Sequence, residues 1–325
     1  IGALLVLAFP FYPMLLLLAF FAHAAAAPLL IYCMDLFLEE FRSKEETGTA
    51  RGMFLTMWNL PTIITPFIAG LIISTSSALT DVTDGNGMGP ISMAALHDMG
   101  YWKIYVISAV FLLPFIIILK TNFSKMRDLV YPDVHIKDTL MHFLKHKNVF
   151  DVFMDRVLLN LFFGWSAIYM PIYLHTHIGF SWNETGFLLV MISLPFVLFQ
   201  GKIGKLQDRI AKEKSLLIAG FLIMSIGSMI VPLITVKSLI PWALLLFIIH
   251  TGASIVEVSS ESYFFKHVSP TNSGFISIFR MTRALPYLII PILVALLLTL
   301  LPFSYMFVVL GLIMLLGIRY AFLIR

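Results

Sequence analysis

The sequence contains few charged residues: Asp, Glu, Lys and Arg make up 12% of its 325 residues, against roughly 25% in a typical soluble domain. Hydrophobic residues make up 59%. A water-soluble chain of this length could not cover so much apolar surface with polar groups. The composition therefore excludes a soluble enzyme, a nucleic-acid-binding domain and a disordered protein, and it predicts a protein that crosses a membrane several times.

Several motifs are also missing. Cysteine occurs once, at Cys33, which excludes a disulfide framework and a cysteine-based metal site. The chain lacks the G-x-x-x-x-G-K-[ST] loop of ATP-driven motors. It also lacks H-E-x-x-H and G-x-S-x-G. No catalytic constellation is clustered in the apolar segments, so we expect no enzymatic activity, no cofactor and no bound metal.

Long apolar runs are what the sequence does contain. A helix needs about 20 mostly apolar residues to cross about 30 Å of hydrocarbon, and runs without alternation fit helices rather than a barrel. Residues 1–9 are apolar but too short, and we interpret them as the end of a helix whose beginning is missing. Complete spans are predicted at 14–38, 53–75, 101–120, 157–176, 185–203, 215–236, 239–261, 275–299 and 302–323.

The distribution of Lys and Arg predicts the orientation. Of the 22 basic residues, 18 lie in or beside the loops on one side and at the C-terminus, two lie on the opposite side, and two lie inside a span. Basic loops stay in the cytoplasm, so this side and the C-terminus are predicted to be cytoplasmic. The same asymmetry explains the net charge of +4 without any nucleic-acid partner.

Residues 35–68 resemble residues 261–293 in the order of their features. Each copy has an acidic residue, a polar turn, and then a helix with two prolines five residues apart, Pro61 and Pro66 in one and Pro286 and Pro291 in the other. Proline bends a membrane helix, so we expect matched kinks. Repeats that run in the same direction and lie six spans apart form the two halves of one large class of transporters.

A short loop after the 185–203 span carries the most specific motif. Gly204, Leu206, Asp208 and Arg209 fit the pattern G-x-L-x-D-R-x-G-R-[RK], and Lys212 stands where a basic residue is expected, whereas Ala211 and Glu213 depart from it. The loop resembles the signature loop of the major facilitator superfamily. Its glycine allows close helix approach, its aspartate can bind the positive N-terminus of a neighbouring helix, and its arginine can pair with a carboxylate.

The resemblance implies an all-α polytopic membrane protein of two six-helix bundles, here lacking helices 1, 2 and most of 3. On this interpretation, residues 1–120 form a partial N-terminal bundle, 121–156 a cytoplasmic linker, and 157–325 a complete C-terminal bundle. The amphipathic stretch 136–150 is either a helix on the membrane surface or part of a flexible linker.

Four charged residues are expected inside the membrane, where they are costly and therefore candidates for function. Glu257 and Glu261 are four residues apart in one span, and Arg280 and Arg283 are three apart in the next, so each pair shares a helix face. Their depths predict two ion pairs, Glu261 with Arg280 and Glu257 with Arg283. Either these pairs form a fixed structural ladder, or Arg283 or Glu257 faces a central cavity and exchanges its partner for solute or a proton.

Four uncharged or weakly basic residues complete the candidate site. His23 and His250 are predicted near mid-membrane on repeat-related helices, where imidazole could relay protons. Asn160 and Trp165 lie in a span that lines the cavity in the family that the chain resembles. Each of the four could instead be a packing residue.

These features predict a secondary active transporter, a symporter or an antiporter, that moves a small solute by alternating access. Protons are the expected driving ion, with a sodium gradient or simple facilitation left open. We expect a monomeric multi-pass protein of the plasma or inner membrane, whose partners are the solute, protons and the lipid bilayer. The alternative is a sensor or scaffold on the same fold that does not transport.

Overall fold

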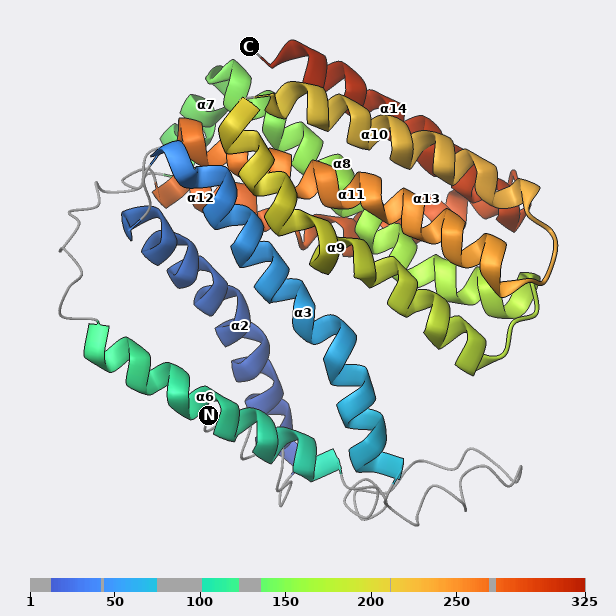
Figure 1. Cartoon of the computed structure of the whole chain (residues 1–325), viewed down its shortest axis with the longest axis horizontal. Helices are drawn as coiled ribbons and strands as arrows, with labels where there is room; N and C mark the ends of the chain where they lie inside the picture. Colours follow the sequence, from blue (N-terminus) through green and yellow to red (C-terminus); the bar gives the residue numbers. More distant parts are fainter. Residues whose placement is uncertain are drawn as a thin grey trace. The chain divides into compact units, whose positions relative to one another are not determined.

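The computed structural model describes residues 13–41, 44–74, 101–122, 136–210, 212–268 and 273–324. Within these ranges the regular structure is helical, and no strand occurs, as the apolar runs predicted. The chain divides into two compact units (Figure 1), Ile1–Glu40 with Ile64–Leu129, and Phe41–Ile63 with Val130–Arg325. The predicted stub at 1–9 and the loop at 76–100 lie outside the described residues.

The first unit is built from α2 (Pro13–Phe41), the second part of α3 (Thr47–Ser74) and α6 (Tyr101–Asn122). The second unit contains the first part of α3 and all the later helices. These are α7 (Ile136–Lys145), α8 (Lys147–Ile172), the π-helical turn η3 (Tyr173–His177), α9 (Trp182–Ile210), α10 (Glu213–Ile230), α11 (Leu239–His267), α12 (Ser273–Met281), α13 (Leu285–Leu298) and α14 (Met306–Leu323).

All the predicted spans fall on helices, and seven helical segments of the described chain are long and apolar enough to cross a membrane. Of the nine predicted spans, those on α3 and α6 are not among these seven, and the apolar part of α6 covers only Tyr105–Ile118. The amphipathic stretch after 136 forms α7. The helix predicted from 157 begins ten residues earlier, at Lys147, because no Pro or Gly interrupts helix-forming residues there.

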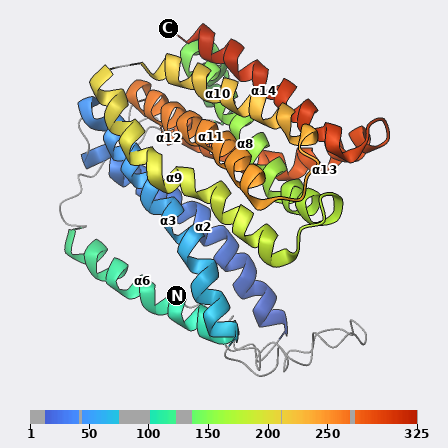
Figure 2. The ribbon, with the colours of Figure 1, turned by 45° about the vertical axis from the view of Figure 1, so that its right-hand side comes forward.

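Small residues let the helices of the second unit pack closely. In this unit α10 packs against both α11 and α14, and α11 packs against α9 (Figure 2). Gly220 of α10 faces Gly252 of α11 so closely that a Cβ on either would lie under 3 Å from the carbonyl oxygen of the other. Close backbone approach at glycine is a common way for membrane helices to associate, and here it holds α10 and α11 together.

The span predicted at 275–299 is interrupted. Thr282, Arg283 and Ala284 form a turn between α12 and α13. Pro286 has no amide hydrogen to donate to the carbonyl of Thr282, and its ring would clash with that carbonyl in a continuous helix. The first copy of the predicted repeat differs, since α3 runs unbroken through Pro61 and Pro66. The two copies therefore differ at this point, since the second has a break, which contains Arg283, and the first has none.

Candidate functional site

An ion cluster of six side chains, Arg51, Arg156, Glu257, Glu261, Arg280 and Arg283, lies in the second unit. Glu261 of α11 is completely buried and receives two hydrogen bonds from Arg280, at 2.5 and 2.9 Å. Arg156 Nη2 lies 3.2 Å from Glu261 Oε1, and Arg51 Nη1 lies 3.6 Å from Glu261 Oε2. The predicted pair of Glu261 with Arg280 is thus confirmed, within a larger set of contacts.

The second predicted pair, Glu257 with Arg283, is wrong. Glu257 accepts hydrogen bonds from Arg156 Nη2 at 3.2 Å and from Gln200 Nε2 at 2.8 Å. Arg283 Nη2 instead lies 4.0 Å from Glu261 Oε1. Depth along one straight helix does not apply here, because a turn separates α12 from α13 and Arg156 of α8 reaches Glu257 first.

Arg156 is the central residue that the sequence analysis missed, together with Arg51 and Gln200. The chain up to 156 was assigned to the cytoplasmic linker, whereas the structure places Arg156 inside α8, where it is buried and bridges Glu257 and Glu261. The available signal was the uninterrupted helical sequence from Lys147 to Phe163, which lacks both Pro and Gly.

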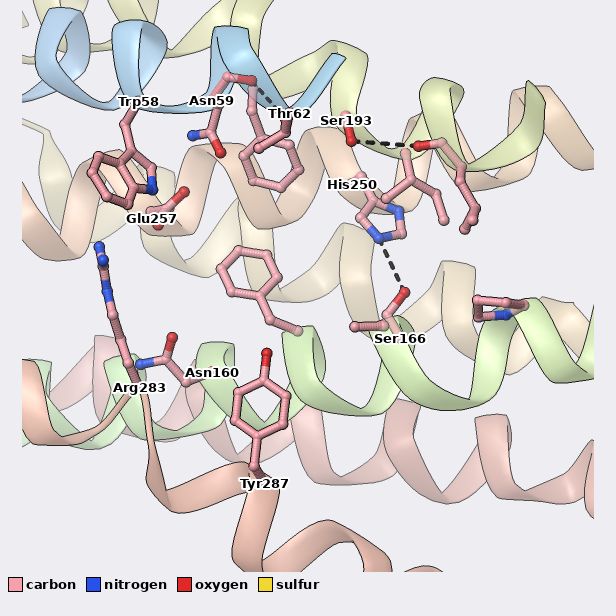
Figure 3. A pocket seen from close by; sticks show the side chains of 16 residues that line it. Trp58, Asn59, Thr62, Asn160, Ser166, Ser193, His250, Glu257, Arg283 and Tyr287 are labelled. Carbon is pink, nitrogen blue, oxygen red and sulfur yellow. Dashed lines mark hydrogen bonds between the residues drawn. The ribbon is translucent and has the colours of Figure 1, made fainter. Parts of the chain in front are cut away.

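A pocket of about 570 Å³ opens beside the ion cluster. As Figure 3 shows, Asn59, Asn160, Glu257 and Arg283 lie at one end of its lining, and Ser166 with His250 lies farther along; Thr62 and Ser193 are further polar lining residues. The aromatic residues of its wall are Trp58, Phe163, Phe196 and Tyr287. Pockets of roughly 300–1,000 Å³ with apolar walls and a few polar groups are typical of small-molecule sites.

His250 lies in the wall of this pocket and is held from both ring nitrogens. Its Nδ1 lies 2.8 Å from the carbonyl oxygen of Leu246, and its Nε2 lies 3.2 Å from Ser166 Oγ. The carbonyl can only accept, so Nδ1 carries the hydrogen, and in a neutral imidazole Nε2 then accepts from the hydroxyl. The ring packs against Phe162 with 5.2 Å between ring centroids.

Of the other predicted site residues, Asn160 lines the pocket, whereas Trp165 and His23 are not among its lining residues. Asn160 lines the pocket and donates from Nδ2 to Thr282 Oγ1 at 2.9 Å, which ties α8 to the break after α12. Trp165 is fully buried against Tyr169 and is not among the pocket-lining residues that the structure describes. His23 lies on α2, in the first unit, where its side chain is exposed. Trp165 is therefore a packing residue in this structure.

The signature loop forms what we call the α3–α9 contact, made by Gly48, Thr49, Gly52, Gly204 and Asp208. The Asp208 carboxylate accepts hydrogen bonds from the amides of Gly48 and Thr49, at 2.8 and 2.6 Å, and from Thr49 Oγ1 at 2.7 Å. These amides open α3, so the aspartate sits at a positive helix N-terminus as expected. Gly204 lies against Gly48 and Gly52 with no room for a Cβ.

The remaining motif residues make fewer contacts. Leu206, Arg209 and Lys212 are exposed, and Arg209 makes no ion pair within the described part of the chain. Lys266 of α11 lies 3.4 Å from Asp208 Oδ1 and 2.5 Å from Glu213 Oε1. Glu213, which departs from the motif, thus shares with Asp208 a cation from a neighbouring helix.

In the described ranges, no group of three or more His, Cys, Asp or Glu side chains could hold a metal ion.

Two comparisons with known proteins bear on the family to which the chain belongs. The chain finds no match among curated proteins. The sequence matches the profile of the Major Facilitator Superfamily over residues 1–285 and 157–325, which together span its whole length. The chain is therefore a multi-pass membrane transporter and belongs to the Major Facilitator Superfamily.

Proposed function

We propose that the protein is a secondary active transporter that moves a small solute by alternating access, driven by protons. The observation that carries the proposal is the pocket of about 570 Å³, whose lining includes both Glu257 and Arg283. The predicted segments 1–120 and 157–325 would be the two moving halves, with the second half extended back to the start of α8 at Lys147 and the residues before it as a cytoplasmic linker. We place the protein in the plasma or inner membrane with its C-terminus in the cytoplasm.

Glu257 is the residue we assign to proton coupling. It lines the pocket and is the acidic residue among the described lining residues, and its carboxylate is held by Arg156 and Gln200. A proton arriving through the pocket would neutralise Glu257 and remove one of the two carboxylates that Arg156 bridges. Arg156 would then pair with Glu261 alone, so proton binding would change the contacts among α8, α9 and α11.

The α3–α9 contact supplies the gating step of the proposal. When α3 separates from α9, the three hydrogen bonds to Asp208 break, and so does the 3.6 Å contact from Arg51 to Glu261. Water can take the place of the partners of Asp208 at the rim, which keeps that part of the cost modest, whereas separating the buried Arg51 from Glu261 makes up the larger part. Closure and opening of this contact would expose the pocket alternately to the two sides.

Reconstitution into liposomes tests the proposal. Pyranine inside the liposomes reports proton entry when sugars, amino acids, carboxylates or nucleosides are added outside under an imposed pH gradient. We expect at least one solute class to move protons, and Glu257→Gln to abolish gradient-driven uptake while preserving solute exchange across the membrane. Undiminished gradient-driven uptake in Glu257→Gln would contradict the coupling role.

Glu184→Gln is the matched control. Glu184 also belongs to a membrane helix, but it is partly exposed and pairs with Ser181 at the start of α9, at 2.8 Å from the Ser181 amide. Glutamine is an accepted replacement in this capping arrangement, so transport should be unchanged. A chain that binds a solute and never moves it would instead be a sensor.

A further inference from the structure

Arg283 stands apart from the other arginines of the ion cluster. Arg280 makes two hydrogen bonds to Glu261, and Arg156 contacts both Glu261 and Glu257. The Arg283 side chain makes no hydrogen bond to any residue that the structure describes, and its nearest carboxylate oxygen lies 4.0 Å away. The N–H donors of its guanidinium are therefore available to a ligand.

The break between α12 and α13 directs this side chain into the pocket. Arg283 is the middle residue of the turn, its amide bonds to the Arg280 carbonyl at 3.2 Å, and Asn160 fixes the preceding residue, Thr282. The Arg283 side chain is 28% exposed, and Figure 3 shows it reaching toward Trp58 and Glu257 in the pocket. Among the described lining residues it is the cation.

We propose that Arg283 binds an oxyanion of the transported solute, and that the solute is a small organic carboxylate. This rests on the proposed transport function. A guanidinium presents paired donors that match a carboxylate or phosphate. The pocket offers one available arginine, and the acidic Glu257 lies beside it. A carboxylate, with one negative charge, therefore fits this pocket better than a phosphate monoester, with two. The walls of Trp58, Phe163 and Phe196 would cover an apolar or aromatic body, and Ser166 lies where a second polar group would reach.

The proposal assigns opposite effects to the two charged lining residues. Replacing Arg283 removes the attraction for the anion, whereas replacing Glu257 removes a like charge from the same pocket. Carboxylate affinity should therefore fall about 10- to 100-fold in Arg283→Gln, the range for a lost hydrogen-bonded charge, and should rise in Glu257→Gln. Arg283→Lys keeps the charge without the paired donors and should be intermediate.

Equilibrium binding to the purified protein in detergent tests this inference without requiring transport. The probes are benzoate, 3-phenylpropionate and nicotinate, each against its primary amide, together with phenyl phosphate and benzylamine. We expect a carboxylate to bind at least tenfold more tightly than its amide, and Arg283→Gln to remove that difference. Arg319→Gln is the matched control, since Arg319 is exposed on α14 and makes no ion pair among the described residues. Melting temperature and gel filtration show whether each variant is folded, and Arg283→Lys serves if Arg283→Gln is not.

The outcomes separate the two proposals. Failure of every carboxylate to bind, equal binding of carboxylate and amide, or stronger binding of phenyl phosphate or benzylamine overturns the carboxylate inference. Proton-linked flux of a neutral or cationic solute would overturn the inference and keep the transport function. Arg283-dependent carboxylate binding without flux in liposomes would keep the inference and overturn the transport function.

Discussion

The ion cluster and the α3–α9 contact each hold a carboxylate close to α3, but with different partners. Glu261 is completely buried, and its partners are guanidinium groups of Arg51, Arg156 and Arg280. Asp208 is 11% exposed and is held mainly by backbone amides at the start of α3. Opening the first would leave buried charges without partners, which is expensive, whereas water can reach the groups of the second. The contacts of Arg156 and Arg280 with Glu261 are therefore suited to a permanent role, and the α3–α9 contact to a reversible one.

The largest effect should come from removing the acid at the centre of the cluster. Glu261→Gln leaves buried arginines without their shared carboxylate, and we expect the free energy of unfolding to fall by about 3–5 kcal/mol. Denaturation of the purified protein in detergent measures this. Glu184→Gln should change it by less than about 0.5 kcal/mol. Equal changes in the free energy of unfolding for the two variants would show that Glu261 does not stabilise the fold through its arginine partners.

A smaller effect is expected from filling the space between α3 and α9. In Gly204→Ala the new methyl group would meet the backbone of Gly48, so the helices must move apart, at a cost of about 1–3 kcal/mol. Gly186→Ala is the control on the same helix, because nothing lies within 4 Å of the Cβ position there. That substitution should stabilise α9 by about 0.5–1 kcal/mol. The same sign of change in both variants would refute close packing at Gly204.

Removing the charge of Asp208 should favour the open contact without unfolding the protein. Asp208→Asn keeps one acceptor oxygen but weakens the charge-assisted bonds to Gly48 and Thr49, by about 1–2 kcal/mol. We expect a maleimide to label a cysteine placed at Leu55, a fully buried residue of α3, about tenfold faster. Cys33 is replaced by serine in this background. Unchanged labelling would mean that Asp208 does not control separation of the helices.

The smallest effect is expected at Asp155, a buried acid that belongs neither to the ion cluster nor to the α3–α9 contact. Asp155 of α8 is completely buried, and neither of its oxygens has a hydrogen-bond partner among the described residues. Neutralising a buried carboxylate that lacks partners removes a desolvation cost, so Asp155→Asn should leave the free energy of unfolding within about 1 kcal/mol or raise it. A fall in the free energy of unfolding as large as that of Glu261→Gln would show that Asp155 has a stabilising partner. The contrast between buried acids with and without ion-pair partners would then fail.

The sequence predicted the parts of the site that depend on local spacing. The i,i+4 pair Glu257 and Glu261 shares the face of α11 that meets Arg280, and the motif placed Asp208 at a helix end. The unbroken helical sequence from Lys147 could have extended α8 over Arg156, but the burial of its side chain depends on the helices that pack around it. The partner of Glu257 depended on that residue, on Gln200 and on the break before Pro286, which are matters of tertiary packing.

The break before Pro286 also links two equilibria. Beyond it, α13 rests on α8, where Gly164 lies against Ile290 and Pro286, while α12 carries Arg280, which is bound to Glu261. Where the proposed solute favours one tilt of α12 relative to α13 by holding Arg283, reciprocity requires that tilt to raise the affinity for the solute by the same factor. A substitution of Pro286 that restores a continuous helix would then change solute affinity from outside the pocket, by fixing the tilt at a single value.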